Sequence, residues 1–282
     1  MADAGSSSAT RHERGRDKIA WLLVTGLFLL RIPFLAGMRY FTWTATSDWV
    51  MPIFEVGTYS LTALLIWAER DRLSENHIDR LALIILILGK PIELLLSRSR
   101  IPLRRPLGSS AYLLYVPIAA GLLVGLARAR PRLVRSGAGR WRWVAIGVLA
   151  GIAVGAFSGW LARLELGPPR GQRLTLAAVT LLPVQHVLYA GIAEEPFFRG
   201  FLWGALRRTG WKDVWVWVLQ GALFWLAHVY WLGRSPVSFW AIVPLGGIVF
   251  GALAWRSRSI AVSTIAHGLV NGVMEMVAFY RP

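Results

Sequence analysis

The run Trp143–Leu161, WVAIGVLAGIAVGAFSGWL, decides the fold class of this chain because it contains no charged residue. About 20 helical residues cross the hydrocarbon core of a bilayer, and an uninterrupted apolar run of this length is typical of a membrane span. In lipid, every backbone polar group must be bonded internally, and a helix achieves this within one segment. The run therefore predicts a transmembrane helix.

Comparable runs recur along the chain, and together they predict an all-α fold, a polytopic transmembrane helical bundle of about eight or nine spans. The other expected spans are Ile19–Met38, Trp49–Ala68, Leu81–Leu96, Tyr112–Ala127, Leu174–Ala193, Val214–Leu232, Phe239–Trp255 and Ile260–Tyr280. Leu81–Leu96 is short and contains Lys90, Pro91 and Glu93, so we expect it to be tilted or re-entrant.

The composition agrees with a membrane protein. Of the 282 residues, 55% are hydrophobic and 16% are charged, and the mean hydropathy is +0.50. The formal net charge is +16, but the arginines lie in short loops between apolar runs. This favours the positive-inside bias and contact with anionic lipid over a nucleic-acid partner. The absence of cysteine excludes disulfides, thiolate catalysis and cysteine metal sites.

The chain divides into three parts. Residues 1–18 are predicted to be a flexible polar tail, residues 19–140 to form N-terminal transmembrane helices of unknown role, and residues 141–282 to form the functional core. Loop charges predict that the N-terminus is cytoplasmic, and that the protein lies in the plasma or inner membrane if it is prokaryotic. One loop opposes this orientation; its basic residues are Arg98, Arg100, Arg104 and Arg105.

The core carries ionisable side chains in apolar surroundings, which are functional candidates because burying each costs at least about 2.5 kcal/mol. Glu195 and Arg199 are four residues apart, so they can form an ion pair on one helix face. Glu194 points about 100° away from Glu195 and has no local partner. An unpartnered carboxylate suits a general base; a surface ion cluster at a helix end is the alternative.

Two further pairs have the same four-residue spacing, Phe224 with His228 and His267 with Asn271. Alone, a histidine on an apolar face is more often structural, and His267 with Asn271 could be interhelical packing contacts. Three helices that each present polar groups at this spacing favour one shared interior cavity. We assign the remaining core histidine, His186, to packing.

The three motifs, in this order, resemble the CAAX-protease and bacteriocin-processing (CPBP) family, which includes the prenyl-protein endopeptidases. The resemblance covers roughly residues 140–280. The motif residues are Glu194, Glu195, Arg199, Phe224, His228, His267 and Asn271. The family fold is a membrane helix bundle around a water-accessible cavity.

The resemblance also implies a role for each polar residue. Glu194 is expected to be the general base, and His228 its partner in holding the attacking water. His267 and Asn271 are expected to stabilise the oxyanion, a contribution of about 3–4 kcal/mol for well-placed donors. The remaining motif residues are expected to support them, Glu195 and Arg199 as an ion pair.

Zinc is possible, since it takes three protein ligands and keeps an open position. Its ligands would then be Glu194, His228 and His267. The chain has no His-Glu-x-x-His motif, so we favour glutamate-activated water with no obligatory cofactor.

We therefore expect an intramembrane endopeptidase that acts on a membrane-associated protein or peptide. One alternative is a non-catalytic membrane partner, such as an immunity or scaffold protein, on the same fold. The other is a transporter or proton relay, which would also bury Glu and His. The sequence shows neither repeat symmetry nor paired broken helices, so the transporter ranks last.

Overall fold

The computed structural model describes residues 15–32, 43–98, 108–131, 133, 139–168 and 173–281. Within these ranges the protein is all-helical, and the only β pairing is an isolated bridge between Arg173 and Arg281. The predicted all-α class is confirmed. The expected tail, residues 1–18, lies mostly outside the described ranges, and residues 15–18 of it are helical.

The helices follow one another along the chain with short connections. After the helix over residues 15–32 come α2 (Trp43–Ala68), α3 (Arg80–Arg98), η1 (Ser110–Leu114), α4 (Tyr115–Ala129), α5 (Arg140–Leu166), α6 (Leu176–His186), η2 (Val187–Gly191), α7 (Ile192–Glu195), η3 (Pro196–Phe201), α8 (Leu202–Arg208), α9 (Asp213–Leu226), η4 (Val229–Trp231), η5 (Ser238–Ile242), α10 (Val243–Ser257) and α11 (Ile260–Phe279).

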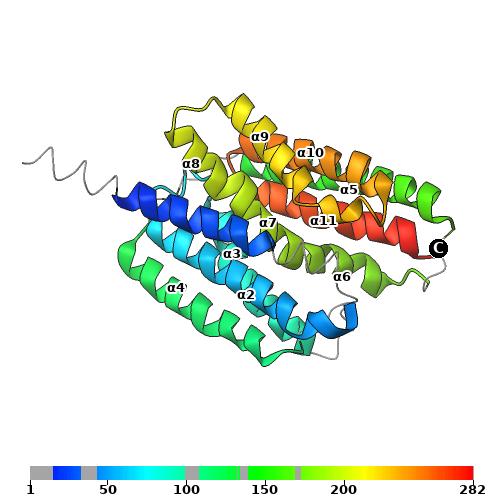
Figure 1. Ribbon diagram of the computed structural model, residues 1–282, viewed down its shortest axis with the longest axis horizontal. Helices are drawn as coiled ribbons and strands as arrows, with labels where there is room; N and C mark the ends of the chain where they lie inside the picture. The colour runs from blue at the N-terminus through cyan, green and yellow to red at the C-terminus, as the bar shows by residue number, and fades with distance from the viewer. Residues whose placement is uncertain are drawn as a thin grey trace, which may run out of the picture.

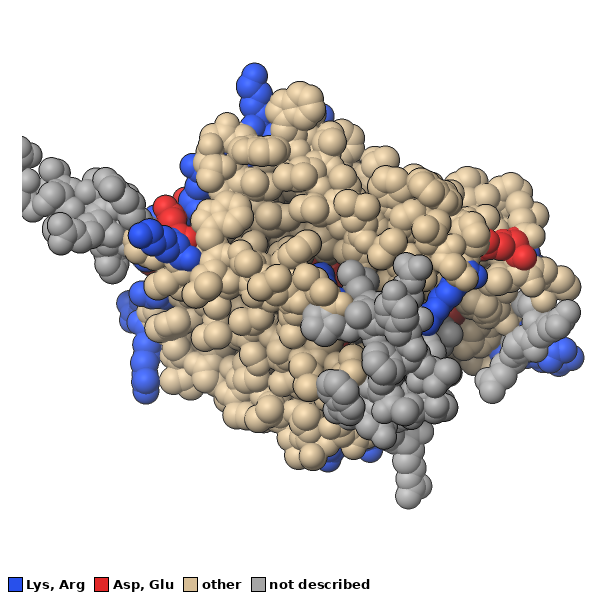
Figure 2. All heavy atoms as spheres, viewed as in Figure 1, with Lys and Arg blue, Asp and Glu red and all other residues tan. Residues whose placement is uncertain are grey.

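The long helices lie side by side along the long axis of the molecule and reverse direction from one to the next (Figure 1). Six helical stretches in the described residues are long and apolar enough to cross a membrane, so the chain is an integral membrane protein. Their surfaces form an apolar band, while lysines and arginines gather mainly toward the two ends of the long axis (Figure 2). The six are Val50–Ala68, Ser110–Ala129, Arg140–Leu166, Leu176–Arg208, Ser238–Ser257 and Ile260–Phe279.

Two of the expected spans differ from the structure in length. The span expected over Leu174–Ala193 continues without a break through α8, so that Leu176–Arg208 is one path of 33 residues. The span expected over Val214–Leu232 is instead the short helix α9, which ends at Leu226. His228 therefore lies in the turn after α9, and the expectation that it lies deep within a helical span is wrong.

A row of glycines brings α5 against α11. They are Gly147, Gly151, Gly155 and Gly159, one every four residues on one face of α5. A Cβ on Gly151 would lie 2.9 Å from the carbonyl oxygen of Ala266, and one on Gly155 the same distance from that of Val270. Small residues let helix backbones approach this closely. The α5 glycines thus fix the position of the helix that carries His267.

The loop between α2 and α3 folds against one end of the bundle. His77 stacks near Trp203, with ring centroids 5.3 Å apart, and its carbonyl accepts a hydrogen bond from the amide of Ile260 at 2.9 Å. Burial, helped by the charge of Arg258, lowers the pKa of His77 to about 4, so its ring is neutral at pH 7. This loop anchors the first residue of α11.

Candidate active site

The site is built on an irregular part of the path Leu176–Arg208. Two π-helical stretches, η2 and η3, flank the single α-helical turn α7. Pro196 opens η3, and proline has no N–H to donate to the helix. Such π-helical turns occur frequently at functional sites. Glu194 and Glu195 are the last two residues of α7, so their side chains leave the helix in different directions.

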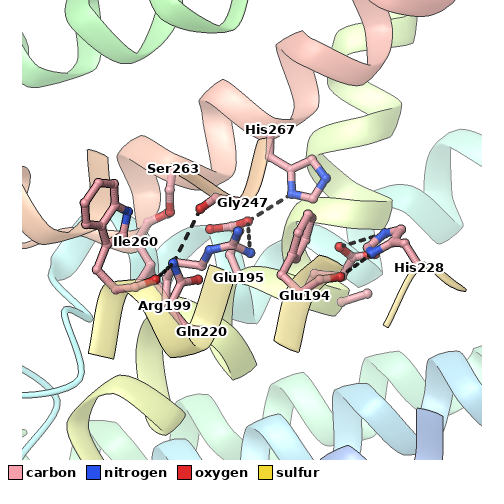
Figure 3. Close-up of polar contacts among 12 residues, drawn as sticks. Glu194, Glu195, Arg199, Gln220, His228, Gly247, Ile260, Ser263 and His267 are labelled. Atoms are coloured by element: carbon pink, nitrogen blue, oxygen red, sulfur yellow. Dashed lines mark hydrogen bonds and ion pairs between the residues drawn. The ribbon is translucent and has the colours of Figure 1, made fainter. Parts of the chain in front are cut away.

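Glu195 faces the interior of the bundle. Its Oε1 atom accepts a hydrogen bond from Nη1 of Arg199 at 3.1 Å, as the four-residue spacing predicted. The same oxygen lies 2.9 Å from Nδ1 of His267, a contact that the sequence did not reveal. The side chains of Glu195 and Arg199 are fully buried. Glu195 therefore pairs with Arg199 and also orients the ring of His267 (Figure 3).

Glu194 faces His228 on the other side of the site. Its Oε2 atom lies 3.8 Å from Nε2 of His228, which is longer than a hydrogen bond. Nδ1 of His228 lies 2.7 Å from the carbonyl oxygen of Phe224, so it is the nitrogen that donates. In the neutral ring Nε2 is then an acceptor, and it faces another acceptor across the gap. Among the described residues, Oε2 of Glu194 has no hydrogen-bond partner.

Phe224 separates the two halves of the site. Its ring centroid lies 4.6 Å from that of His228 and 5.9 Å from that of His267. The guanidinium of Arg199 lies 4.2 Å from the same ring centroid, a cation–π contact. Phe224 is buried, so one aromatic ring fixes the spacing of both imidazoles and the arginine.

The structure thus brings six of the seven predicted site residues into one connected cluster. They are Glu194, Glu195, Arg199, Phe224, His228 and His267. The seventh, Asn271, lies one helical turn after His267 on α11 and is partly exposed. Near the middle of the face drawn in Figure 2 there is a small opening with acidic and basic atoms at its base.

The arrangement does not gather a three-ligand metal site. Within the described ranges no group of three His, Cys, Asp or Glu residues is placed to hold a metal ion. Glu194 pairs with His228, whereas His267 is bonded to Glu195. Zinc in a catalytic site takes three protein ligands together, so the donor set of this chain does not fit it in this conformation.

Arg31, which belongs to none of the three motifs, reaches the site from the helix over residues 15–32. Its Nη2 atom donates to the carbonyl oxygen of Ala193 at 2.7 Å, and the residue is 5% exposed. Its guanidinium lies 4.9 Å from the ring centroid of Phe197. The signal was available, since an arginine inside the expected span Ile19–Met38 is a functional candidate by position alone.

A second buried ion cluster lies in the N-terminal half, to which the sequence assigned no role. Nζ of Lys90 lies 2.6 Å from Glu93 and 3.3 Å from Glu55, and Tyr115 donates to Glu55 at 3.2 Å. Lys90 also lies 5.3 Å from the ring centroid of Tyr189 in η2. The N-terminal helices therefore contact the helix that carries the site.

The segment that carries the site matches a known family. Residues 176–273 match the family model described as Type II CAAX prenyl endopeptidase Rce1-like. The matched segment contains all three motifs, and it confirms the predicted resemblance. It supports a CAAX-type protease activity for this part of the chain. Neither the curated proteins nor the solved structures gave a match to the chain.

Proposed function

Because residues 176–273 match a family of membrane prenyl endopeptidases, we propose that this chain is an intramembrane endopeptidase of glutamic type. Glu194 is the general base, His228 holds the attacking water with it, and His267 and Asn271 stabilise the oxyanion. The ion pair of Glu195 and Arg199 supports the site. The contacts described above support the roles of Glu194, Glu195, Arg199, His228 and His267, and the role of Asn271 rests on the family resemblance alone.

The observation that carries this proposal is the gap between Glu194 and His228. Two acceptors that face one another 3.8 Å apart do not bond directly. A polar contact longer than about 3.5 Å is the usual sign of a bridging water. A water between these atoms donates one hydrogen to the carboxylate and one to Nε2, which leaves its lone pair free to attack a carbonyl carbon.

The reaction proposed from this arrangement is a two-step hydrolysis. The water oxygen bonds to the carbonyl carbon of the scissile peptide while its proton moves to the Glu194 carboxylate, and the carbonyl electrons become an oxyanion. The carbon–nitrogen bond then breaks, and the proton on Glu194 passes to the leaving nitrogen. The products are a carboxylic acid and an amine, and no step passes through a metal.

The same geometry sets a condition on His267. Its Nδ1 atom is directed at Glu195, so only Nε2 is free to serve the oxyanion. A donor is required there, so the proposed role needs Nε2–H of His267 to face the oxyanion while Nδ1 faces Glu195. Glu195 in turn is shared with Arg199. This is why a fully buried ion pair supports an oxyanion site rather than acting as a second base.

The substrate follows from the position of the site. It lies among apolar helices of an integral membrane protein, so we propose a membrane-associated protein or peptide substrate that meets the site from the bilayer. The bilayer is the other partner, and the proposed orientation has a cytoplasmic N-terminus. A prenylated C-terminal peptide is the first probe to use, because the matched family is named for that activity.

The experiment compares purified wild-type protein, Glu194→Gln and the control Glu75→Gln in detergent micelles. Glu75 lies in the α2–α3 loop with its side chain 52% exposed, far from the site in sequence. The substrate is an internally quenched farnesylated peptide, assayed with and without a zinc chelator. We expect activity in wild type and control, unaffected by the chelator, and none in Glu194→Gln. Full activity in Glu194→Gln would eliminate the proposed base, and loss on chelation would assign a metal.

A further inference from the structure

The mechanism above gives no task to the buried guanidinium of Arg31, which contacts the helix that carries Glu194. Three phenylalanine rings surround it, at centroid distances of 5.8 Å for Phe54, 4.9 Å for Phe197 and 5.3 Å for Phe198. One edge of the guanidinium is used by the carbonyl oxygen of Ala193. Among the described residues, the other edge, at Nη1, is buried and has no hydrogen-bond partner. Burying a cationic donor without a partner is costly, which points to an anion that binds there.

The charges around Arg31 indicate at which stage of the proposed reaction an anion binds to it. The other arginine of the site, Arg199, is already balanced by Glu195. Glu194 is the carboxylate that attracts Arg31, and the two are not in direct contact among the ion pairs described. Before the reaction, Glu194 therefore balances Arg31. When Glu194 takes the proton of the attacking water, that balance is lost unless the new negative charge forms nearby.

We propose that Arg31 is a further catalytic residue, whose free N–H edge binds the substrate oxygen on which negative charge develops. This rests on the proposed function. As the water proton moves to Glu194, the electron pair of the scissile C=O bond moves to its oxygen, so the negative charge moves from the carboxylate to the oxyanion. The fixed charge of Arg31 balances it in both states. A permanent cation in place before the reaction needs no reorganisation, which is the source of such stabilisation.

The structural alternative is that Arg31 only bonds the helix at Ala193, shortly before the π-helical stretch that begins at Pro196. Two substitutions separate the roles. Arg31→Gln removes the charge but keeps an amide that can donate to the Ala193 carbonyl. Arg31→Lys keeps the charge. The matched control is Arg16→Gln on the same helix, because Arg16 is partly exposed and pairs with Asp71 at 3.1 Å outside the site.

The test measures kcat and KM for the farnesylated peptide as a free acid and as a C-terminal amide, with thermal midpoints for every variant. We expect Arg31→Gln to lower kcat by about 10²- to 10³-fold for both peptides while KM changes little. Arg31→Lys should recover part of this loss, and Arg16→Gln should match wild type. Added guanidinium should restore activity to Arg31→Ala but not to Glu194→Gln.

Three results would overturn the proposal. Wild-type kcat in Arg31→Gln would remove Arg31 from catalysis. A loss that affects only KM of the free acid would assign Arg31 to the substrate's terminal carboxylate instead. An equal loss in Arg31→Gln and Arg31→Lys, with lowered thermal midpoints, would make the role structural. If wild type cleaves neither peptide, the proposed function fails first, and the role of Arg31 fails with it.

Discussion

The molecule buries two ion clusters, and they differ in what they leave open. In the N-terminal half, Lys90 lies between Glu55 and Glu93, and a tyrosine hydroxyl completes the set. In the other half, Glu194 and His228 face one another with a gap between them, and a carboxylate oxygen has no partner in the described chain. The first cluster satisfies its charges within the protein, whereas the second leaves room for water and substrate.

The difference teaches how to separate structural from catalytic ionisable groups in a membrane protein. Both clusters carry charged groups among apolar helices, so charge in an apolar setting alone does not distinguish them. The two clusters differ in whether their polar atoms have hydrogen-bond partners within the protein. A charged group whose partners all belong to the protein stabilises the fold, whereas one with a polar atom that lacks a partner is available for chemistry. The two clusters should therefore respond to substitution in opposite ways.

The largest effect should come from the open pair. His228→Ala removes one of the two atoms that hold the water, so kcat should fall by about 10²- to 10⁴-fold while the thermal midpoint stays near wild type. His186 is the matched control, because its ring pairs with Glu275 at 3.0 Å, about two helical turns after His267 on α11. His186→Ala should keep its kcat. Equal activity in both variants would remove the distinction drawn here.

The next largest effect should come from the closed cluster. Lys90→Met leaves Glu55 and Glu93 without their shared cation, so the free energy of unfolding should fall by about 3–5 kcal/mol. Adding Glu55→Gln and Glu93→Gln should restore much of this stability, because no charge then remains buried. Thermal unfolding in detergent measures both. If Lys90→Met instead left the stability normal and lowered kcat, the cluster around Lys90 would have a role in catalysis.

A smaller effect should follow from moving α11, the helix that carries His267. In Gly155→Leu the new side chain meets the Val270 carbonyl at 2.9 Å, so α11 must shift, at a cost of about 1–3 kcal/mol. We expect kcat to fall about tenfold. Gly121→Leu on α4 is the control, since nothing lies within 4 Å of its position. If the two variants behave alike, the glycine row does not position the site.

The smallest effect should come from an ion pair at the surface. Arg16 and Asp71 lie 3.1 Å apart, with side chains 23% and 45% exposed. Exposed pairs contribute about 0–1 kcal/mol, and salt screens them. Asp71→Asn should therefore shift the thermal midpoint very little and leave kcat unchanged. A loss as large as that of Lys90→Met would mean that exposure does not set the value of an ion pair here.

The sequence was sufficient for the fold class and for most of the cluster. Long apolar runs specify membrane helices, and four-residue spacing specifies a shared face, so Glu195 with Arg199 followed directly. The contact between His267 and Glu195 did not follow, because it depends on how α11 packs, which the α5 glycines decide. The turn at His228 was also missed, because the apolar composition continues beyond the end of α9.

Arg31 could not be connected to the site by spacing, because it lies 162 residues before the carbonyl that it contacts. Such a contact comes from tertiary packing and has no local pattern. Its position inside an apolar run was the one available sign. The same holds for Lys90, whose partner Glu55 is 35 residues away on another helix.

The shortness of α9 has a consequence for the lipid around the protein. Its 14 residues rise about 21 Å, whereas the hydrocarbon core is about 30 Å thick. A hydrophobic helix shorter than the core is accommodated by local thinning of the bilayer or by its flanking residues. His228 follows the end of α9. Local thinning there would shorten the path through lipid of the water that the proposed hydrolysis requires.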